Sequence, residues 1–521
     1  MSYSTYAAID IGPSKLSMKI YEVSKTKGIR ELSHTRQPLA LGAEVYTHGV
    51  VSYKTTKEIC QTLNDFKRIM QDFGANQWQV YTTSGLREAS NAMIVIDQIQ
   101  IQTGFDVKIL SNSEARFLYY KALALKDDSF DKLIRQGTLI ADIGGGSVQL
   151  SIFDKGKLQT DIDLVFQTLK TGKLQTTQNL LLGSSRIQEL LHVMEEKAYD
   201  FHDLIDEYIE KDLYAFQKLY LEHIKIKNVL IMGELIPELY YKINPQKLPQ
   251  TTISVDKKIF RKKLLFSHHD AGIDRLTAPT MILCRKITEL TQCENVLFAN
   301  VDFCDSMAAE FADKKMKLHP QHDFTQDILS SSEMIARKYH VDMDHVENVQ
   351  TLALQFFDRI RKLHGLGKRE RLLLQISVIL HSCGLYIDSI DSRECSYQII
   401  MSTEIIGLSH KERAMIAHIV RYNSEAFPSY GSFQEDFSKQ EYISMTKLNS
   451  ILRIANVLDK SNRHKIKSVS VTLKNDQLIV TADTMADITL EQGLFNRKAL
   501  AFQNIFGIKP VLRQKRSGKR G

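Results

Sequence analysis

Two aspartates stand at the ends of short apolar runs, and each is followed by Ile-Gly. Asp10 closes the run that begins at Thr5, and Asp142 closes the run that begins at Leu139. A buried carboxylate needs a cation or a hydrogen-bond donor, because an unpaired buried charge is costly. Brought together, the two supply hard oxygen ligands suited to Mg²⁺. A single Asp-Ile-Gly is better explained as an aspartate that caps its own turn, but the repetition favours the metal-binding interpretation.

Two other stretches have the composition of phosphate-binding loops. The residues after the second Asp-Ile are Gly144, Gly145, Gly146 and Ser147. Their backbone can bend until successive N–H groups point at one anion, although glycines also serve simple hairpins. Ser84 and Arg87 lie where an extended segment passes into a helix, whose N-terminal amides favour anions. Arg87 would contact a phosphate there; the alternative is an ordinary surface ion pair.

Glu114 is a candidate general base. It follows Ser111-Asn112-Ser113 and begins a predicted helix, where an acid in the first turn is most often a capping residue. Beside a phosphate held between the two aspartate turns, the same carboxylate would take a proton from an attacking water. The residue pattern by itself leaves both roles open.

The elements that must position these residues form a repeat. Apolar residues alternate with polar ones over 16–20, after the first aspartate, and over 148–152, after the second. Each copy therefore predicts a buried strand, a tight turn and a second strand. Because the two aspartates are 132 residues apart, the repeat predicts a duplicated domain with two turns that face each other.

The remaining pattern predicts α/β layers followed by helices. We expect helices over 55–73, 86–101 and 114–125, strands over 77–83 and 228–232, a polar link over 127–136 and a long helical stretch over 178–223. From 318 to 423 the spacing is that of amphipathic helices. A helix over 448–462 and a hairpin formed by 468–472 and 477–482 follow.

Length and charge exclude several classes of protein. The 521 residues suggest roughly three to four domains, and 43% hydrophobic with 25% charged residues are typical of a folded globular chain. The net charge is +7, but six basic residues lie between Lys509 and Gly521, so the rest carries only +1. That balance excludes a general nucleic-acid binder, and we expect the basic tail to be a solvated end.

Cysteine usage and the N-terminal residues indicate the compartment. The six cysteines include no Cys-x-x-Cys pair and are too sparse for a disulfide framework, so we expect them to be reduced. The first ten residues lack the basic segment of a secretion signal, and the longest apolar runs are about half a membrane span. These features predict a cytoplasmic protein that does not contact a membrane.

In combination, four motifs resemble the exopolyphosphatase and guanosine pentaphosphate phosphohydrolase (Ppx/GppA) family. They are Asp10-Ile11-Gly12, Thr83-Ser84-Gly85-Leu86-Arg87-Glu88-Ala89, Ser113-Glu114-Ala115-Arg116 and Ala141-Asp142-Ile143-Gly144-Gly145-Gly146-Ser147. Segments at 380–384, 421–423, 452–459 and 502–507 look like the family's helical and C-terminal domains. The likeness covers nearly the whole chain and is weakest over 157–320.

The resemblance implies an α/β fold of duplicated actin-like domains of the ribonuclease-H type, with the active site in the cleft between them. These domains would span 1–128 and 129–317, followed by an all-α degenerate HD-like domain over 318–463 and a small α+β C-terminal domain with the basic tail over 464–521. His345, His381 and Asp459 align with HD metal ligands, but Ser382 stands where an aspartate is needed, so we expect no working metal site there. Such domain arrangements often form homodimers.

The resemblance also implies a role for each candidate residue. The expected reaction is Mg²⁺-dependent removal of the terminal phosphate from inorganic polyphosphate, with Glu114 as base and Asp10 and Asp142 as the catalytic, metal-associated acids. The implied substrate-binding residues are Lys15, Ser84, Arg87, Gly144, Gly145, Gly146 and Ser147. Phosphoryl transfer mainly requires positioning and neutralisation of oxygen charge, which these groups would supply.

Several departures from the family pattern keep other functions open. Pro13 removes an N–H donor from the first turn, Lys15 restores attraction by its charge, and Gln149 replaces a carboxylate expected near the metal. In the second half of the repeat, the family has a loop similar to Gly-Gly-Thr that contacts phosphate. This chain has Met232-Gly233-Glu234 in its place. The alternatives are 5′-phosphate hydrolysis of guanosine pentaphosphate and non-catalytic binding of polyphosphate or guanosine alarmones. An actin-like sugar kinase is disfavoured because the adenosine loop is missing.

Overall fold

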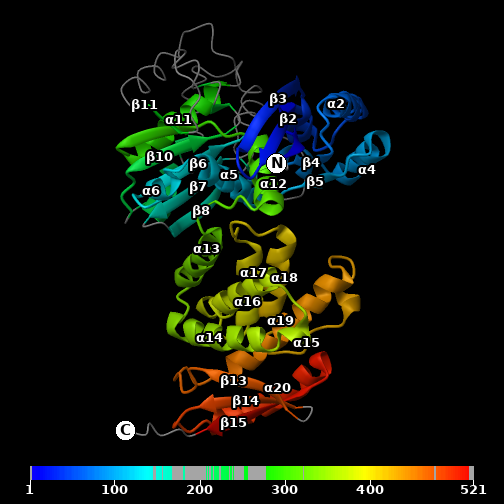
Figure 1. Cartoon of the computed structure of the whole chain (residues 1–521). Coiled ribbons are helices and arrows are strands. Elements are labelled where there is room, and N and C mark those ends of the chain that lie inside the picture. The colour runs from blue at the N-terminus through cyan, green and yellow to red at the C-terminus, as the bar shows by residue number, and fades with distance from the viewer. Residues whose placement is uncertain are drawn as a thin grey trace. The chain divides into compact units, whose positions relative to one another are not determined.

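The structure, a computed structural model, describes most of the chain (Figure 1). It covers residues 3–144, 148–154, 157–166, 180–181, parts of 207–239, 252–255, 277–320, 322–474 and 477–515. The chain divides into two compact units, Met1–Asp327 and Ile328–Gly521. Each unit contains both helices and a β-sheet, which is the mixed α/β class that the sequence predicts.

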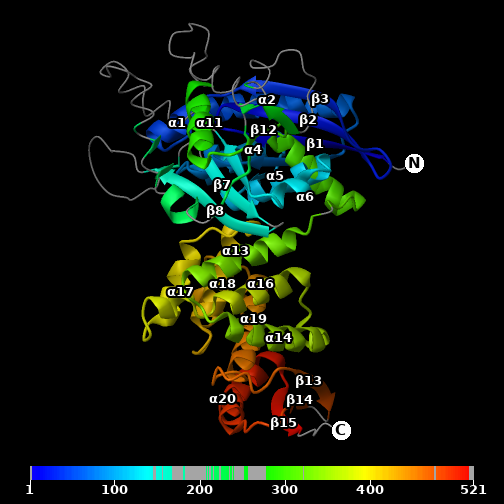
Figure 2. The ribbon, with the colours of Figure 1, turned by 90° about the vertical axis from the view of Figure 1, so that its left-hand side faces the viewer.

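The first sheet has five strands in the order β3-β2-β1-β4-β5 (Figures 1 and 2). They are β1 (Tyr3–Ile11), β2 (Lys15–Ser24), β3 (Gly28–Pro38), β4 (Gln77–Thr82) and β5 (Val107–Ile109). β2 lies antiparallel to both β1 and β3, whereas β4 runs parallel to β1 and β5 runs parallel to β4. The predicted strand over 77–83 is therefore a central strand of this sheet.

The second sheet repeats this arrangement. Its central strands are β8 (Lys157–Phe166), β7 (Val148–Asp154), β6 (Thr138–Ile143), β10 (Asn228–Met232) and β12 (Asn295–Ala299), in that spatial order. β7 is antiparallel to β6 and β8, and β10 is parallel to β6 and β12. The order and directions match those of the first sheet, as the repeat of Asp-Ile-Gly predicts. β9 (Leu180–Leu181) and β11 (Thr252–Val255) extend the sheet at its edges.

Helices cover both faces of the first sheet. On one face, α1 (Leu41–His48), α2 (Tyr53–Asp72) and α4 (Ala92–Thr103) share one apolar core with the strands. On the other face lie α5 (Asn112–Lys126) and α12 (Phe303–Phe311), which pack against each other and against β1. The single helix expected over 86–101 is instead α3 (Ser84–Arg87) followed by α4, with a break between them.

Of two other predictions for the first unit, one needs correction and the other falls largely on residues that the structure does not describe. The polar link expected over 127–136 contains a short helix, α6 (Phe130–Ile134), whose two end residues are buried. The helical stretch expected over 178–223 lies largely outside the described residues. α11 (Thr277–Thr291) contributes to the apolar core of the second sheet.

Polar residues on β2 face the helices α5 and α12 rather than solvent. Lys19 is only 7% exposed, and its Nζ lies 2.7 Å from Asp302 Oδ2 and 3.4 Å from Asp305 Oδ2. Asp305 Oδ1 also lies 2.8 Å from Lys126 Nζ and accepts a hydrogen bond of 2.8 Å from the Tyr21 hydroxyl. Burial opposes ionisation of Asp305, but Lys126 and Lys19 hold the pKa of its carboxyl well below its usual range. This buried ion network joins β2, the end of α5 and the start of α12.

The second unit is helical and ends in a small sheet. α13 (Phe324–Lys338) crosses the boundary between the units, and α14 (Met343–Arg359), α15 (Arg361–His364), α16 (Lys368–Leu380), α17 (Ser392–Met401), α18 (His410–Arg421) and α19 (Lys439–Val457) follow. α19 begins nine residues before the predicted helix, because Ser438 and Glu441 form a capping box there. The hairpin pairs β13 (Val469–Lys474) with β14 (Gln477–Asp483), as predicted.

The basic tail is not wholly solvated as expected. Lys509–Lys515 form β15, which runs parallel to β14, and α20 (Thr489–Phe506) packs against it. Pro510 and Leu512 are buried, while the basic side chains of Lys509 and Arg513 are exposed. The alternation of apolar and basic residues in this segment is thus that of a strand with one buried face.

The structure bears on two further features of the sequence, its apolar runs and its cysteines. Among the described residues, no helix is both long enough and apolar enough to cross a membrane. All six cysteines are free thiols, as expected, and five of them are buried.

Asp305→Ala tests the buried ion network. The substitution leaves Lys126 and the Tyr21 hydroxyl without this acceptor, and breaking a buried ion pair costs about 3–5 kcal/mol. We expect urea denaturation of the full chain to show a loss of that size in the free energy of unfolding. Asp65→Ala is the control, because the ion pair of Asp65 with Arg68 is exposed and is worth about 0–1 kcal/mol. Equally small losses for both variants would contradict the role given to the network.

Candidate active site

The carboxyl ends of β1, β4 and β5 lie side by side at one edge of the first sheet. Ile11 pairs with Thr82, and Thr82 pairs with Ile109. Thr82 Oγ1 donates a hydrogen bond of 2.8 Å to Ile11 O, and Leu110 N donates one of 2.9 Å to Thr82 O. The chain segments that leave these strands therefore start from one row, which is where parallel sheets usually place their ligands.

The turn after β1 is held by its carbonyl groups. Gly12 N donates to Lys15 O at 3.0 Å, and the carbonyl of Pro13 accepts a hydrogen bond of 2.7 Å from Gly42 N. A Cβ on Gly12 would lie 3.7 Å from Asp10 Oδ2, so the Asp10 carboxylate lies beside this turn. The N–H that proline lacks is thus not needed to hold the turn, although one potential donor to a ligand is still missing.

Helix α3 packs directly against the same turn. A Cβ on Gly85 would lie 2.9 Å from Leu41 Cδ2 and 3.4 Å from Pro13 Cα, so glycine permits this close approach. Ser84 is buried, and its Oγ lies 3.0 Å from the Tyr46 hydroxyl. Two of the predicted site segments, at 10–15 and 84–87, are therefore neighbours in the structure.

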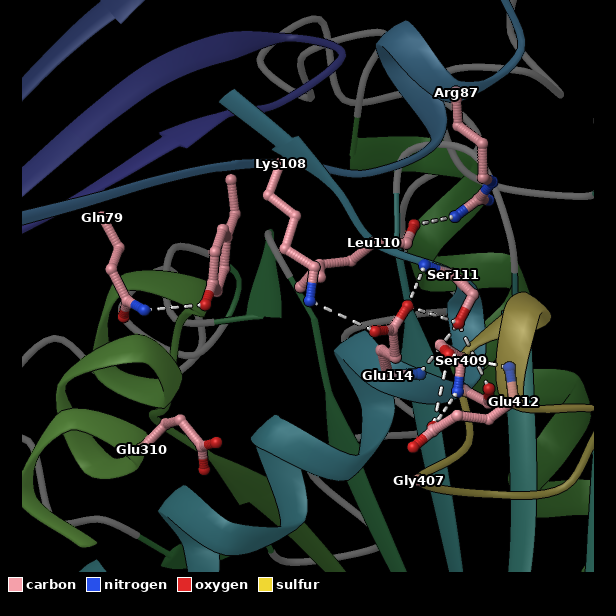
Figure 3. Close-up of polar contacts among 12 residues, drawn as sticks. Gln79, Arg87, Lys108, Leu110, Ser111, Glu114, Glu310, Gly407, Ser409 and Glu412 are labelled. Carbon is pink, nitrogen blue, oxygen red and sulfur yellow. Dashed lines mark hydrogen bonds and ion pairs between the residues drawn. The ribbon is translucent and has the colours of Figure 1, made fainter. Parts of the chain in front are cut away.

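Arg87 of α3 is bonded to the segment that leads from β5 into α5. Its Nη1 donates a hydrogen bond of 2.8 Å to Leu110 O (Figure 3). Its Nη2 donates one of 2.7 Å to Asn112 Oδ1. Arg87 is thus neither paired with Glu88 nor a free surface cation. Its role as a phosphate contact remains a prediction, because both observed bonds run to protein groups.

Glu114 has the geometry of a capping residue (Figure 3). Its Oε2 accepts hydrogen bonds of 3.0 Å from both Ser111 N and Ser111 Oγ, while Glu114 N donates to Ser111 Oγ at 3.2 Å. Its Oε1 lies 3.4 Å from Lys108 Nζ. The side chain is 19% exposed, so a water can reach the carboxylate while the cap is in place. The capping role is observed, and the role as general base remains a prediction.

The second sheet places Asp142 in the equivalent position. Asp142 is next to last in β6, lies opposite Gln149 of β7 and beside Met232 of β10, and is only 8% exposed. Gly144 follows at the end of β6, whereas Gly145, Gly146 and Ser147 lie outside the described residues. The aspartate is thus buried next to the amide that the sequence shows in place of a second carboxylate.

Gly233 makes a close backbone contact with the turn after β6. Its φ is +139°, and a Cβ there would lie 2.1 Å from Ile143 O, which no side chain would tolerate. The segment that leaves β10 thus approaches the second turn as α3 approaches the first. Glu234, the next residue of this loop, lies outside the described residues.

Helix α5 connects the two halves of this region. Its N-terminus carries Glu114 beside the first sheet, and its Tyr120 hydroxyl donates a hydrogen bond of 2.6 Å to Ser151 Oγ of β7. Ser151 lies opposite Ile140, two residues before Asp142. Helix α5 therefore spans from the row of β4 and β5 to the strand that bears the second aspartate.

The sequence analysis assigns no role to three residues of this region. Lys108 pairs with Glu114 from a strand of only three residues, which is too short to give a periodic signal. Arg116 and Tyr120 are completely buried on α5. Their spacing of four residues places both on one face of the helix, and that spacing was the available signal.

Comparison with known proteins identifies the family. A family model described as "Ppx/GppA phosphatase family" matches residues 19–211, and one described as "Ppx/GppA phosphatase, domain III" matches residues 329–505. The chain belongs to the Ppx/GppA phosphatase family. Ppx/GppA phosphatases hydrolyse phosphoanhydride bonds, so the protein is a phosphoanhydride hydrolase, as predicted.

Relatives of this Ppx/GppA phosphatase are distant in sequence. A guanosine-5′-triphosphate,3′-diphosphate pyrophosphatase of Photobacterium profundum is 21% identical over 510 residues, which are 94% of this chain and 95% of the relative. An exopolyphosphatase structure from Cytophaga hutchinsonii is 17% identical, has a TM-score of 0.48 and covers 60% of this chain and 98% of its own. A family member from Aquifex aeolicus is 15% identical, with a TM-score of 0.45 and coverages of 60% and 99%.

The carboxylates of Asp10 and Asp142 have the chemistry of ligands for a metal ion that keeps most of its water. Within the residues that the structure describes, no three His, Cys, Asp or Glu side chains gather to form a complete metal cage. Mg²⁺ does not require one, because it is usually held by one or two carboxylates together with waters and substrate phosphates. The buried Asp142 and the Asp10 carboxylate beside Gly12 are donors of this kind.

His345, His381 and Asp459, which align with HD metal ligands, form hydrogen bonds to protein groups. Asp459 Oδ2 lies 2.8 Å from His345 Nδ1 and 2.9 Å from His464 Nδ1. His381 Nδ1 lies 2.7 Å from Val378 O, and burial lowers the pKa of His381 to about 4. His381 is therefore a hydrogen-bonded residue of the helical core, which is the interpretation the missing aspartate favours.

Gly233→Ala tests the close contact behind Asp142. The added methyl group would meet Ile143 O, so the turn after β6 must move, and displacements of about 1 Å can cost about 100-fold in rate. We expect phosphoanhydride hydrolysis to fall at least tenfold. Gly49→Ala is the control, because Gly49 has φ +74° but no atom near its Cβ position. If Gly233→Ala hydrolyses substrate as fast as Gly49→Ala, the contact does not position the site.

Proposed function

We propose that this Ppx/GppA phosphatase is an exopolyphosphatase, which releases orthophosphate from the end of inorganic polyphosphate with Mg²⁺. The observation that carries the proposal is the row formed by Ile11, Thr82 and Ile109, because it gathers the segments of Asp10, Arg87 and Glu114 at one sheet edge. The second sheet repeats this geometry at Asp142.

The proposed architecture is that of the family. The two repeated sheets would form actin-like domains over 1–128 and 129–317, and 318–463 and 464–521 would be the HD-like and C-terminal domains. The equal strand order and directions of the two sheets support the first part of this proposal. In an actin-like pair, the turns after β1 and β6 border one cleft, which would bring Asp10 and Asp142 to the same phosphate.

The proposed mechanism uses each residue for one task. Asp10 and Asp142 would hold Mg²⁺, which when bound neutralises charge on the phosphate oxygens. Glu114 would orient a water and take its proton as the water oxygen attacks the terminal phosphorus. The hydrogen bonds from Ser111 hold the Glu114 carboxylate in one orientation, so little reorganisation is needed for that step.

Substrate binding would fall to the neighbouring loops. Gly144, Gly145, Gly146 and Ser147 would supply N–H and hydroxyl donors to the terminal phosphate. Lys15 begins β2 directly after the first turn, and Ser84 begins α3, whose Gly85 lies against that turn. Lys15 adds a positive charge where Pro13 lacks a donor. Arg87 would reach the phosphate only by exchanging one of its bonds to Leu110 or Asn112.

A second candidate is removal of the 5′ phosphate from guanosine pentaphosphate. The relative from Photobacterium profundum, named for guanosine-5′-triphosphate,3′-diphosphate, aligns over 94% of this chain, and this full-length match favours the alternative. Both reactions would use the same carboxylates. Orthophosphate release from long polyphosphate, short polyphosphate and guanosine pentaphosphate, each with and without Mg²⁺, separates the two. Binding of these compounds without release would favour a non-catalytic protein.

Glu114→Gln tests the general base. We expect kcat to fall by about 100-fold or more while KM changes little, because the amide can still occupy the cap but cannot take a proton. Steady-state orthophosphate release from polyphosphate measures both constants.

Glu441→Gln is a closely matched control. Glu441 forms the same capping box with Ser438, and its Oε2 lies 3.4 Å from Lys411 Nζ, the distance seen between Glu114 and Lys108. We expect this variant to keep the kcat of the parent. Equal kcat values for Glu114→Gln and the parent would show that Glu114 is only a cap.

A further inference from the structure

The Tyr120 hydroxyl joins helix α5 to the second sheet inside the protein core. It donates a hydrogen bond of 2.6 Å to Ser151 Oγ of β7, and both residues are 0% exposed. The Tyr120 ring meets the ring of Phe153 of β7 edge to face, with the ring centres 5.7 Å apart. A buried hydroxyl is costly without a partner, so phenylalanine would fill this place more simply if packing were the only requirement. The hydroxyl therefore adds a bond, and not packing, to this contact.

This hydrogen bond lies between two of the candidate site residues. On α5, Glu114 precedes Tyr120 by six residues, which is about 9 Å along the helix axis at 1.5 Å per residue. On the second sheet, Ser151 lies opposite Ile140 of β6, which is two residues, or about 7 Å of strand, before Asp142. The bond thus links the helix that carries the candidate base to the strands that carry the second aspartate.

A directional contact is what such a link requires. Apolar side chains hold a helix on a sheet by contacts without a preferred direction, so they tolerate small shifts along the helix axis. A hydrogen bond weakens steeply when its length or angle changes, so it defines one position. Arg87 of α3 already holds the first turn of α5 at the edge of the first sheet, through Asn112. The bond from Tyr120 supplies the corresponding constraint toward the second sheet.

We propose that Tyr120 is a positioning residue for phosphoanhydride hydrolysis, because its bond to Ser151 sets the distance between the elements that carry Glu114 and Asp142. A water that attacks phosphorus must be held at about 3–3.5 Å, and a misplacement of about 1 Å can cost about 100-fold in rate. The two hydroxyls do not contact substrate in this role and act only through the placement of the two carboxylates. The inference rests on the tasks given to Glu114 and Asp142 in the proposed mechanism.

Tyr120→Phe removes the hydroxyl and keeps the ring that packs on Phe153. We expect kcat for orthophosphate release from polyphosphate to fall about tenfold while KM changes by less than about twofold, because the alignment of the attacking water is lost but the substrate loops are untouched. Ser151→Ala removes the same bond from the other side, so it gives the same test if Tyr120→Phe folds poorly. The variant with both changes should be no slower than either single one.

Tyr6→Phe is the matched control. Tyr6 of β1 is also 0% exposed, and its hydroxyl donates a hydrogen bond of 2.7 Å to Gln79 Oε1 of β4. The same atom is removed from an equally buried residue, but this bond joins two strands of one sheet. Both variants should lower the Tm of the full chain by a similar small amount, whereas Tyr6→Phe should keep the kcat of the parent. Equal losses of kcat in the two variants would contradict the role given to Tyr120.

A Glu114→Gln background separates a positioning role from a general loss of structure. Tyr120→Phe should slow hydrolysis no further in that background, because the carboxylate that it places is already absent. A further loss of about tenfold there, or a kcat equal to the parent's for both Tyr120→Phe and Ser151→Ala, would overturn this inference and leave the proposed function standing. A kcat equal to the parent's for Glu114→Gln alone would overturn the general base, and with it both the proposed mechanism and this inference.

Discussion

The register between β1, β4 and β5 is the constraint on which the candidate site depends. Ile11, Thr82 and Ile109 share one row, so the segments that begin at Gly12, Ser84 and Ser111 all leave the sheet at the same edge. Shifting one strand by a single residue would turn its side chains to the other face and separate these segments. The contacts of Gly85 with the first turn and of Arg87 with α5 are consequences of this alignment.

Helix α5 fixes the position of the first sheet relative to the second, because it is held at both ends and also contacts β7. Glu114 and Arg87 fix its first turn, and Lys126 in its last turn pairs with Asp305 in the buried ion network. The 15 residues of α5 span about 22 Å at 1.5 Å per residue, and Tyr120 contacts β7 between these ends. The network that packs α12 onto the first sheet is thus part of what positions the site.

Local patterns in the sequence predict some of these elements and not others. The strand at 228–232 and the repeat around Asp10 and Asp142 follow from apolar runs and turns, which are local signals. The alternation over 16–20 correctly predicts a strand, but it does not show what covers the polar face of that strand. Lys19 on this face is buried, because α12, nearly 300 residues later, covers it. The role of Glu114 as a cap was one of two predicted roles, since sequence alone cannot tell which group its carboxylate contacts.

The central claim is that Asp10 and Asp142 act on one metal-bound phosphate. The most direct measurement is a double-mutant cycle on kcat at saturating Mg²⁺ with Asp10→Asn, Asp142→Asn and both together. If the two carboxylates work as one unit, each single change lowers kcat by about 100-fold or more, and the double change is hardly worse than the more damaging single one. Losses that simply multiply, or a single variant with unchanged kcat, would contradict the account.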